Sequence, residues 1–133
     1  MILVDTSVWI DYFNGIKNKQ TENLDRILSE QSVLVGDIML TEILQGFDSD
    51  KEFRLARQAL DPLDCVHLGG KSLAIKAASN FRFLRSKGVT IRKTADMLIG
   101  SWCIAHEVEL LHNDKDFDLW LFCSKLTPHS VSN

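Results

Sequence analysis

The sequence predicts an α/β fold of three layers, with a mostly parallel central sheet and helices on both faces. One observation is that short apolar runs alternate with segments whose apolar residues have helical spacing. The other is size and composition: 133 residues, 45% hydrophobic and 25% charged, are typical of one globular domain. We therefore expect a single domain over residues 1–133.

The expected elements follow one another in a regular order. The predicted strands are 1–4, 32–36, 65–68 and 108–111, with a short edge strand at 125–128. The predicted helices are 8–13 capped by Ser7, one opened by Thr21, one from Asp37 or Thr41 to Gly46, 49–60, 72–86, and 95–106 capped by Thr94. Strands that alternate with helices in this way favour a parallel sheet.

Composition narrows the cellular context. No apolar run approaches the roughly 20 residues that cross a bilayer. The acid at Asp5, with no basic segment before it, argues against a secretory signal. The three cysteines, Cys65, Cys103 and Cys123, are odd in number and widely spaced, which fits neither a disulfide framework nor a zinc knuckle. We expect a cytoplasmic protein with reduced thiols and no membrane association.

The net charge of -3 hides an uneven distribution. Residues 1–64 carry 12 acids and 6 bases, residues 65–95 carry 7 bases and no acid, and residues 96–133 carry 6 acids and 2 bases. The basic stretch has two interpretations. It is either a solvated helix face or an electropositive surface for a polyanion or an acidic partner chain.

Four acids stand in notable positions. In a parallel sheet, ligand groups collect beyond the carboxyl ends of the strands. Asp5 follows the first predicted strand and Asp114 the fourth, while Glu42 and Asp96 lie in the first turns of predicted helices. Each acid also has a structural explanation, as a helix cap, a turn residue or a partner of the helix dipole. If the four converge, their repulsion requires either raised carboxyl pKa values or a bound cation, and oxygen ligands favour Mg²⁺ or Mn²⁺.

Four segments occur in a characteristic order. They are Ile2–Ser7, Thr41–Gly46, Thr94–Ile99 and Asn113–Phe117. With them the chain resembles the PIN-domain ribonucleases, and among these the VapC-type toxins of bacterial toxin–antitoxin pairs. The resemblance covers nearly the whole chain and implies a PIN-like fold.

The resemblance also implies a site and partners. Asp5, Glu42, Asp96 and Asp114 would be the catalytic, metal-binding quartet, and Asp116 matches a position that only some members use. The expected activity is Mg²⁺-dependent endonucleolytic hydrolysis of RNA. The expected partners are a second copy in a homodimer and a small antitoxin that covers the acidic cleft.

This chemistry suits the residues. A bound Mg²⁺ ion lowers the pKa of a coordinated water and neutralises charge on the phosphate. The sequence leaves open one ion or two, and whether Glu42 or Asp114 accepts the water's proton. Thr6 or Ser7 could hydrogen-bond a water or a phosphate oxygen, although Ser7 also suits a helix N-cap.

The basic stretch then has a role beside the quartet. The side chains expected to hold RNA phosphates are Arg82, Arg85, Lys87, Arg92 and Lys93. The aromatic residues that could stack on bases, or instead pack in the core or at a dimer contact, are Trp9, Tyr12 and Phe13.

Two other functions compete with the nuclease. The first is a non-catalytic RNA- or protein-binding module on the same fold. The second is a phosphotransferase or phosphatase that uses Asp5 as its nucleophile. Such enzymes of the haloacid dehalogenase type need a second Asp two residues later, where this chain has Ser7.

Overall fold

The computed structural model describes residues 1–114 and 117–118, and these form two compact units. Of the described residues, the first unit comprises Met1–His67 with Glu109–Asn113, and the second comprises Leu68–Val108 with Asp114, Phe117 and Asp118. The edge strand predicted at 125–128 and the candidate ligand Asp116 lie outside the described residues. That residues 1–133 form a single domain stays a prediction.

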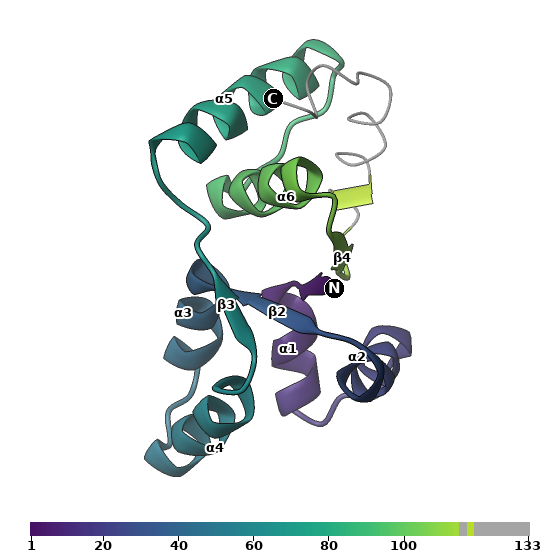
Figure 1. Ribbon diagram of the computed structural model, residues 1–133, viewed down its shortest axis with the longest axis vertical. Helices are drawn as coiled ribbons and strands as arrows, with labels where there is room; N and C mark the ends of the chain where they lie inside the picture. Colours follow the sequence, from purple (N-terminus) through teal and green to yellow (C-terminus); the bar gives the residue numbers. More distant parts are fainter. Residues whose placement is uncertain (115–116, 119–133) are drawn as a thin grey trace. The chain divides into compact units, whose positions relative to one another are not determined.

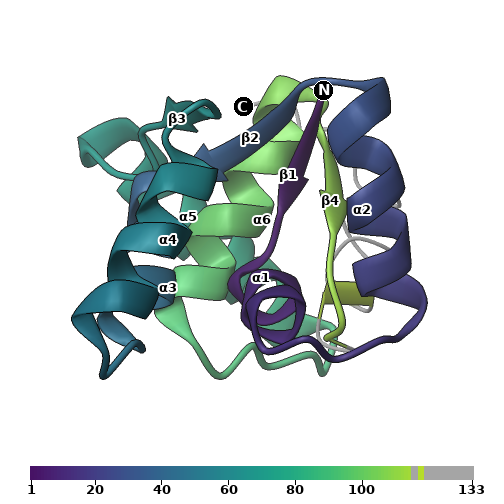
Figure 2. The same cartoon turned by 90° about the horizontal axis from the view of Figure 1, so that it is seen from below.

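The first unit contains a sheet of four parallel strands in the order β3-β2-β1-β4. The strands are β1 (Ile2–Val4), β2 (Val33–Gly36), β3 (Asp64–Val66) and β4 (Glu109–Leu111). Figure 2 shows β1 between β2 and β4, with Leu3 opposite Leu34 on one side and Leu110 on the other. Every residue of β1 and β2 is buried, as a strand covered on both faces requires. The predicted α/β class with a parallel sheet is confirmed.

Four helices belong to the first unit. They are α1 (Thr6–Phe13), α2 (Lys19–Glu30), α3 (Asp37–Gln45) and α4 (Asp50–Leu60). Helices α1, α3 and α4 lie on the same side of the sheet (Figure 1), and α1 packs on α3. Trp9 is 2% exposed and stacks on Phe13 at a centroid distance of 5.7 Å. For Trp9, core packing is therefore the correct one of the two interpretations.

The second unit is built around two helices, α5 (Lys71–Ser86) and α6 (Thr94–His106), which lie side by side (Figure 1). Its apolar core contains Ala77, Leu84, Ile91 and Met97. One buried hydrogen bond joins the helices, because the Nδ2 of Asn80 donates to the Oγ of Ser101 at 3.0 Å. Without this bond, the polar side chains of Asn80 and Ser101 would lack a hydrogen-bond partner in the packed interior.

The helix starts differ from the predictions. Asp5, and not Ser7, caps α1, because its carboxylate accepts the backbone N–H of Ser7. Asn18 caps α2, and Thr21, the predicted cap, instead forms the second half of a capping box with it. Helix α6 begins at Thr94 itself, so Thr94 is its first residue and not its cap. No helix in the described part of the chain is both long and apolar enough to cross a membrane.

Candidate functional site

Asp5 stands where β1 ends and α1 begins. Its backbone N–H donates to the carbonyl oxygen of Leu111 at the end of β4, at 2.9 Å. Its side chain is 7% exposed, and Oδ2 accepts the hydroxyl of Ser7 at 2.8 Å and the N–H of Ser7 at 3.4 Å. The ends of β1 and β4 are therefore neighbours in the sheet, and the Asp5 carboxylate is fixed at that edge.

Glu42 lies in the middle of α3, as the sixth of its nine residues. The first-turn position predicted for it is wrong, because the helix begins at Asp37 and not at Thr41. The half-buried Glu42 side chain accepts the hydroxyl of Thr6 through Oε1 at 2.9 Å. A dipole interaction with the helix start is thereby excluded as its role, since that effect fades within the first turn.

Two of the four predicted acids, Asp5 and Glu42, belong to the first unit, and one residue connects them. The residue that holds Glu42 is Thr6, which directly follows Asp5 in the chain. Among the described residues, no hydrogen bond reaches Asp5 Oδ1 or Glu42 Oε2. An ionised carboxylate offers about four acceptor positions, so both side chains keep capacity for a further ligand.

The other two acids belong to the second unit. Asp96 is the third residue of α6, so its predicted position in the first turn of a helix is confirmed. The residue is 9% exposed. Asp114 is half-buried and follows β4 by three residues, and its carbonyl accepts the N–H of Phe117 at 3.2 Å. Asp96 and Asp114 each make a further interaction within the protein. Within either unit, the described residues form no group of three or more metal-binding side chains.

The donor chemistry fits the predicted ion. Asp5 and Glu42 offer carboxylate oxygens only, and hydroxyls already orient one oxygen of each. Hard oxygen ligands select Mg²⁺ or Mn²⁺ over zinc. A carboxylate held by neighbouring donors is also the usual state of a metal ligand. The pair in the first unit can therefore contribute ligands to a magnesium site.

The Cys65 thiol is a poor alternative ligand. Cys65 is exposed on β3, and its partial burial together with the Asp37 carboxylate raises the pKa of its thiol. A raised thiol pKa disfavours the thiolate, which is the form that binds metals and attacks electrophiles. Asp37 is itself paired with His67, whose Nδ1 lies 3.0 Å from Asp37 Oδ2. The Cys65 thiol therefore favours its protonated form.

Sequence reasoning missed one acid. Asp11 on α1 accepts the side-chain amide of Asn113 at 3.5 Å and that of Asn18 at 3.3 Å. It thereby ties the segment after β4, which leads into Asp114, to the same helix that Asp5 caps. No local signal in the sequence could have found this contact, because it joins opposite ends of the chain.

Comparison with known proteins identifies the family. The sequence matches the PIN domain over residues 2–119. The chain belongs to the PIN-domain family. It is 30% identical over 121 residues to the VapC ribonuclease Mb1587 of Mycobacterium bovis and to ribonuclease VapC11 of Mycobacterium tuberculosis. These alignments cover 90% of this chain and 90% of each relative, so this PIN-domain chain is VapC-type.

Solved structures show the same fold. VapBC2 from Rickettsia felis, bound to a DNA fragment from its promoter, matches with a TM-score of 0.71 and 21% identity, covering 89% of this chain and 92% of the other. FitAcB from Neisseria gonorrhoeae matches with a TM-score of 0.72 and 20% identity, covering 90% and 93%. The PIN-like fold and the VapC-type resemblance that the sequence predicts are confirmed. The roles of the four acids and of Asp116 stay predictions.

Proposed function

We propose that this VapC-type chain is a Mg²⁺-dependent endoribonuclease that hydrolyses RNA phosphodiester bonds. The observation that carries the proposal is the link between Asp5 and Glu42, in which Thr6 bonds Glu42 at 2.9 Å directly after the end of β1. The bond joins the residue next to Asp5 to the Glu42 carboxylate on α3. The names of the relatives, VapC ribonucleases at 30% identity, support the same activity.

The protein's own residues would divide the work. Asp5, Glu42, Asp96 and Asp114 would bind Mg²⁺, and Asp116 would add a further oxygen. The bound ion would supply charge neutralisation at the phosphate and acidify water. Ser7 and Thr6 hold the oxygens of Asp5 and Glu42 so that little reorganisation is required when the substrate arrives. Either Glu42 or Asp114 would accept the proton of the attacking water.

The sheet supports the inclusion of Asp114. It follows Leu111 by three residues, and a fully extended chain of that length reaches only roughly 11 Å. Leu111 accepts the backbone N–H of Asp5 at 2.9 Å. The polypeptide therefore tethers Asp114 to the strand end that carries Asp5, whatever its side chain contacts.

The biological role follows from the family. We infer that the chain is the toxin of a type II toxin–antitoxin pair, that it acts in the cytoplasm, and that it forms a homodimer. A small cognate antitoxin would inhibit it by covering the acidic cleft. The similarity to VapBC2, a named complex, supports a protein partner for this chain.

Cleavage assays test the activity. Purified chain free of inhibitor is incubated with structured RNAs and either Mg²⁺ or EDTA, beside Asp96→Asn and the exposed Asp48→Asn as a control with the same charge change. We expect cleavage only with the ion, and a loss on the order of a hundredfold or more in Asp96→Asn alone. Asp48→Asn should match the wild type.

Other outcomes identify the competing functions. Retention of RNA without cleavage, in folded protein, would support the non-catalytic binding module. Release of phosphate from small esters, abolished by Asp5→Asn, would support a phosphatase. Millimolar Mg²⁺ should also raise the melting temperature of the wild type, because it would bind only folded protein.

A further inference from the structure

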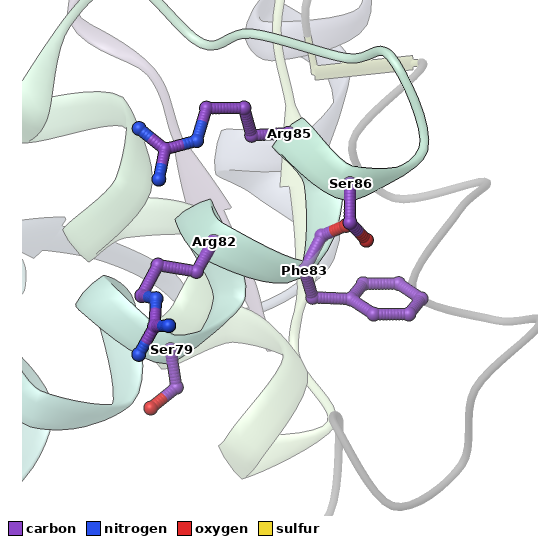
Figure 3. A pocket seen from close by; sticks show the side chains of 5 residues that line it. All are labelled: Ser79, Arg82, Phe83, Arg85 and Ser86. Carbon is purple, nitrogen blue, oxygen red and sulfur yellow. The ribbon is translucent and has the colours of Figure 1, made fainter.

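One face of α5 is hollowed. Ser79, Arg82, Phe83, Arg85 and Ser86 line an open depression of about 540 Å³, called here the basic hollow (Figure 3). Ser79, Arg82, Phe83 and Ser86 are separated by three or four residues, which places them on one face of the helix. The hollow belongs wholly to the second unit.

The positive charges of the hollow are not paired with carboxylates of the described residues. Arg82 and Arg85 are exposed, and within the described part of the chain neither forms an ion pair with a carboxylate. Residues 65–95 contain no acid at all. Two guanidinium groups at one depression attract an anion, and their planar donors match phosphate oxygens.

Aromatic rings contact two basic side chains, Arg85 of the hollow and Lys87 at the end of α5. The guanidinium carbon of Arg85 lies 5.6 Å from the ring centroid of Phe81, and the Nζ of Lys87 lies 5.8 Å from that of Phe83. A guanidinium over a ring face keeps its in-plane N–H donors available for a ligand. Figure 3 shows the Arg82 side chain reaching toward Ser79, whose hydroxyl is a further donor.

We infer that the basic hollow binds a nucleotide of single-stranded RNA, with Arg82 and Arg85 on a backbone phosphate and the Phe83 ring against the base. This inference rests on the proposed function, since the RNA is the substrate of the nuclease. A half-buried ring and two guanidinium groups that line the same hollow favour a nucleotide over an acidic peptide, because a peptide carboxylate offers no flat base to stack. Single strands are favoured over duplexes because only their base faces are free.

Binding measurements test the inference without cleavage. Fluorescence anisotropy of a labelled single-stranded RNA is recorded in EDTA with the full chain, Arg82→Gln, Arg85→Gln and Lys71→Gln. Lys71 is an exposed base of α5 outside the hollow, so its variant makes the same charge change on the same helix. We expect a roughly tenfold weaker affinity for each arginine variant and a change under about twofold for Lys71→Gln. The slope of log affinity against log salt should fall by about 0.7 for each lost phosphate contact.

A second variant separates base stacking from charge. Phe83→Leu should weaken binding of the RNA by about fivefold or more, while leaving affinity for an abasic strand of equal length unchanged. Equal losses in Arg82→Gln and Lys71→Gln, or tighter binding of a polyglutamate peptide than of RNA, would overturn the inference. Thermal melts show whether each variant is folded.

The two proposals can fail separately. If Mg²⁺-dependent cleavage occurs and Arg82→Gln binds RNA like the wild type, the basic hollow is not an RNA site and the nuclease stands. If Arg82→Gln loses RNA while the wild type never cleaves, the hollow binds RNA and the nuclease proposal is wrong.

Discussion

The first unit carries 13 acidic and 6 basic residues, whereas residues 68–108 of the second carry 2 acidic and 7 basic ones. The two sets of charges also differ in how they are held. Asp5 is 7% exposed at the end of a buried strand, and Ser7 hydrogen-bonds its carboxylate. Arg82 and Arg85 are exposed on a helix face.

The difference matches two kinds of task. An Asp side chain on a buried backbone has two rotatable bonds, so its oxygens stay where the sheet puts them. Chemistry at a phosphate requires such fixed positions, since misplacement by about 1 Å can cost a hundredfold in rate. Long arginine side chains are flexible. They suit the binding of a polyanion, whose phosphate charges are neutralised through many loose contacts. The whole-chain net charge of -3 conceals both properties.

The largest effect on stability should come from weakening β1, the strand that ends directly before Asp5. Leu3 in β1 is 0% exposed, and Leu3→Ala should lower the free energy of unfolding by about 2–5 kcal/mol. Ile75 on α5 is 58% exposed, so Ile75→Ala should change it by under about 0.5 kcal/mol. Urea denaturation measures both values. Equal losses would contradict the contrast between a rigid strand and an exposed helix face.

The elements of the fold were predictable because their signals are local. The strand expected at 32–36 is β2 at Val33–Gly36, since a fully buried parallel strand must be apolar throughout. The helix expected at 49–60 is α4 at Asp50–Leu60, and Ser49 is its cap. The start of α1 was not predictable in this way. Asp5 and Ser7 are both good caps, and the sheet decided between them by holding the Asp5 N–H against Leu111.

The site was predictable in composition and less so in its contacts. Placement of Asp5 followed from the rule that ligand groups lie beyond strand ends. Glu42 was singled out as an acid at a predicted helix start and then through the family resemblance, but its bond to Thr6 depends on how α1 and α3 pack, which no local pattern encodes. The contact between Asp11 and Asn113 has the same long-range origin.

An intermediate effect should come from the link between the two acids. Thr6→Val keeps the shape of the side chain and removes the hydroxyl that donates to Glu42 Oε1. Because both residues are half-buried, we expect a loss of about 1 kcal/mol in the free energy of unfolding. Thr6→Ser keeps the donor and is the matched control.

A double-mutant cycle with Glu42→Gln isolates this link. Additive losses in the double variant would show that the hydroxyl and the carboxylate do not interact in solution. A coupling of about 1 kcal/mol would support an Asp5–Glu42 unit that is held before any ligand binds.

The smallest effect on stability should come from a further negative charge in the first unit, the ionised side chain of Tyr12. Partial burial and the neighbouring Asp25, whose Oδ1 lies 3.4 Å from the hydroxyl, raise the pKa of Tyr12 above its ordinary value of 10.0. Above pH 10 the unfolded chain therefore releases the phenol proton before the folded chain does. Stability from this source is complete below pH 10 and is lost as pH rises through the raised pKa.

Tyr12 is the single tyrosine of the chain, so the absorbance of tyrosinate reports it alone. Its titration midpoint should lie above 10.0 in the wild type and fall toward that value in Asp25→Asn. The free energy of unfolding should decrease more steeply with pH above 10 in the wild type than in Tyr12→Phe, because lysine and cysteine titrations affect both proteins alike. A titration midpoint of Tyr12 at or below 10.0 would mean that the first unit tolerates a further negative charge beside Asp25. The acids of the first unit would then be less rigidly held than the contrast with the exposed face of α5 assumes.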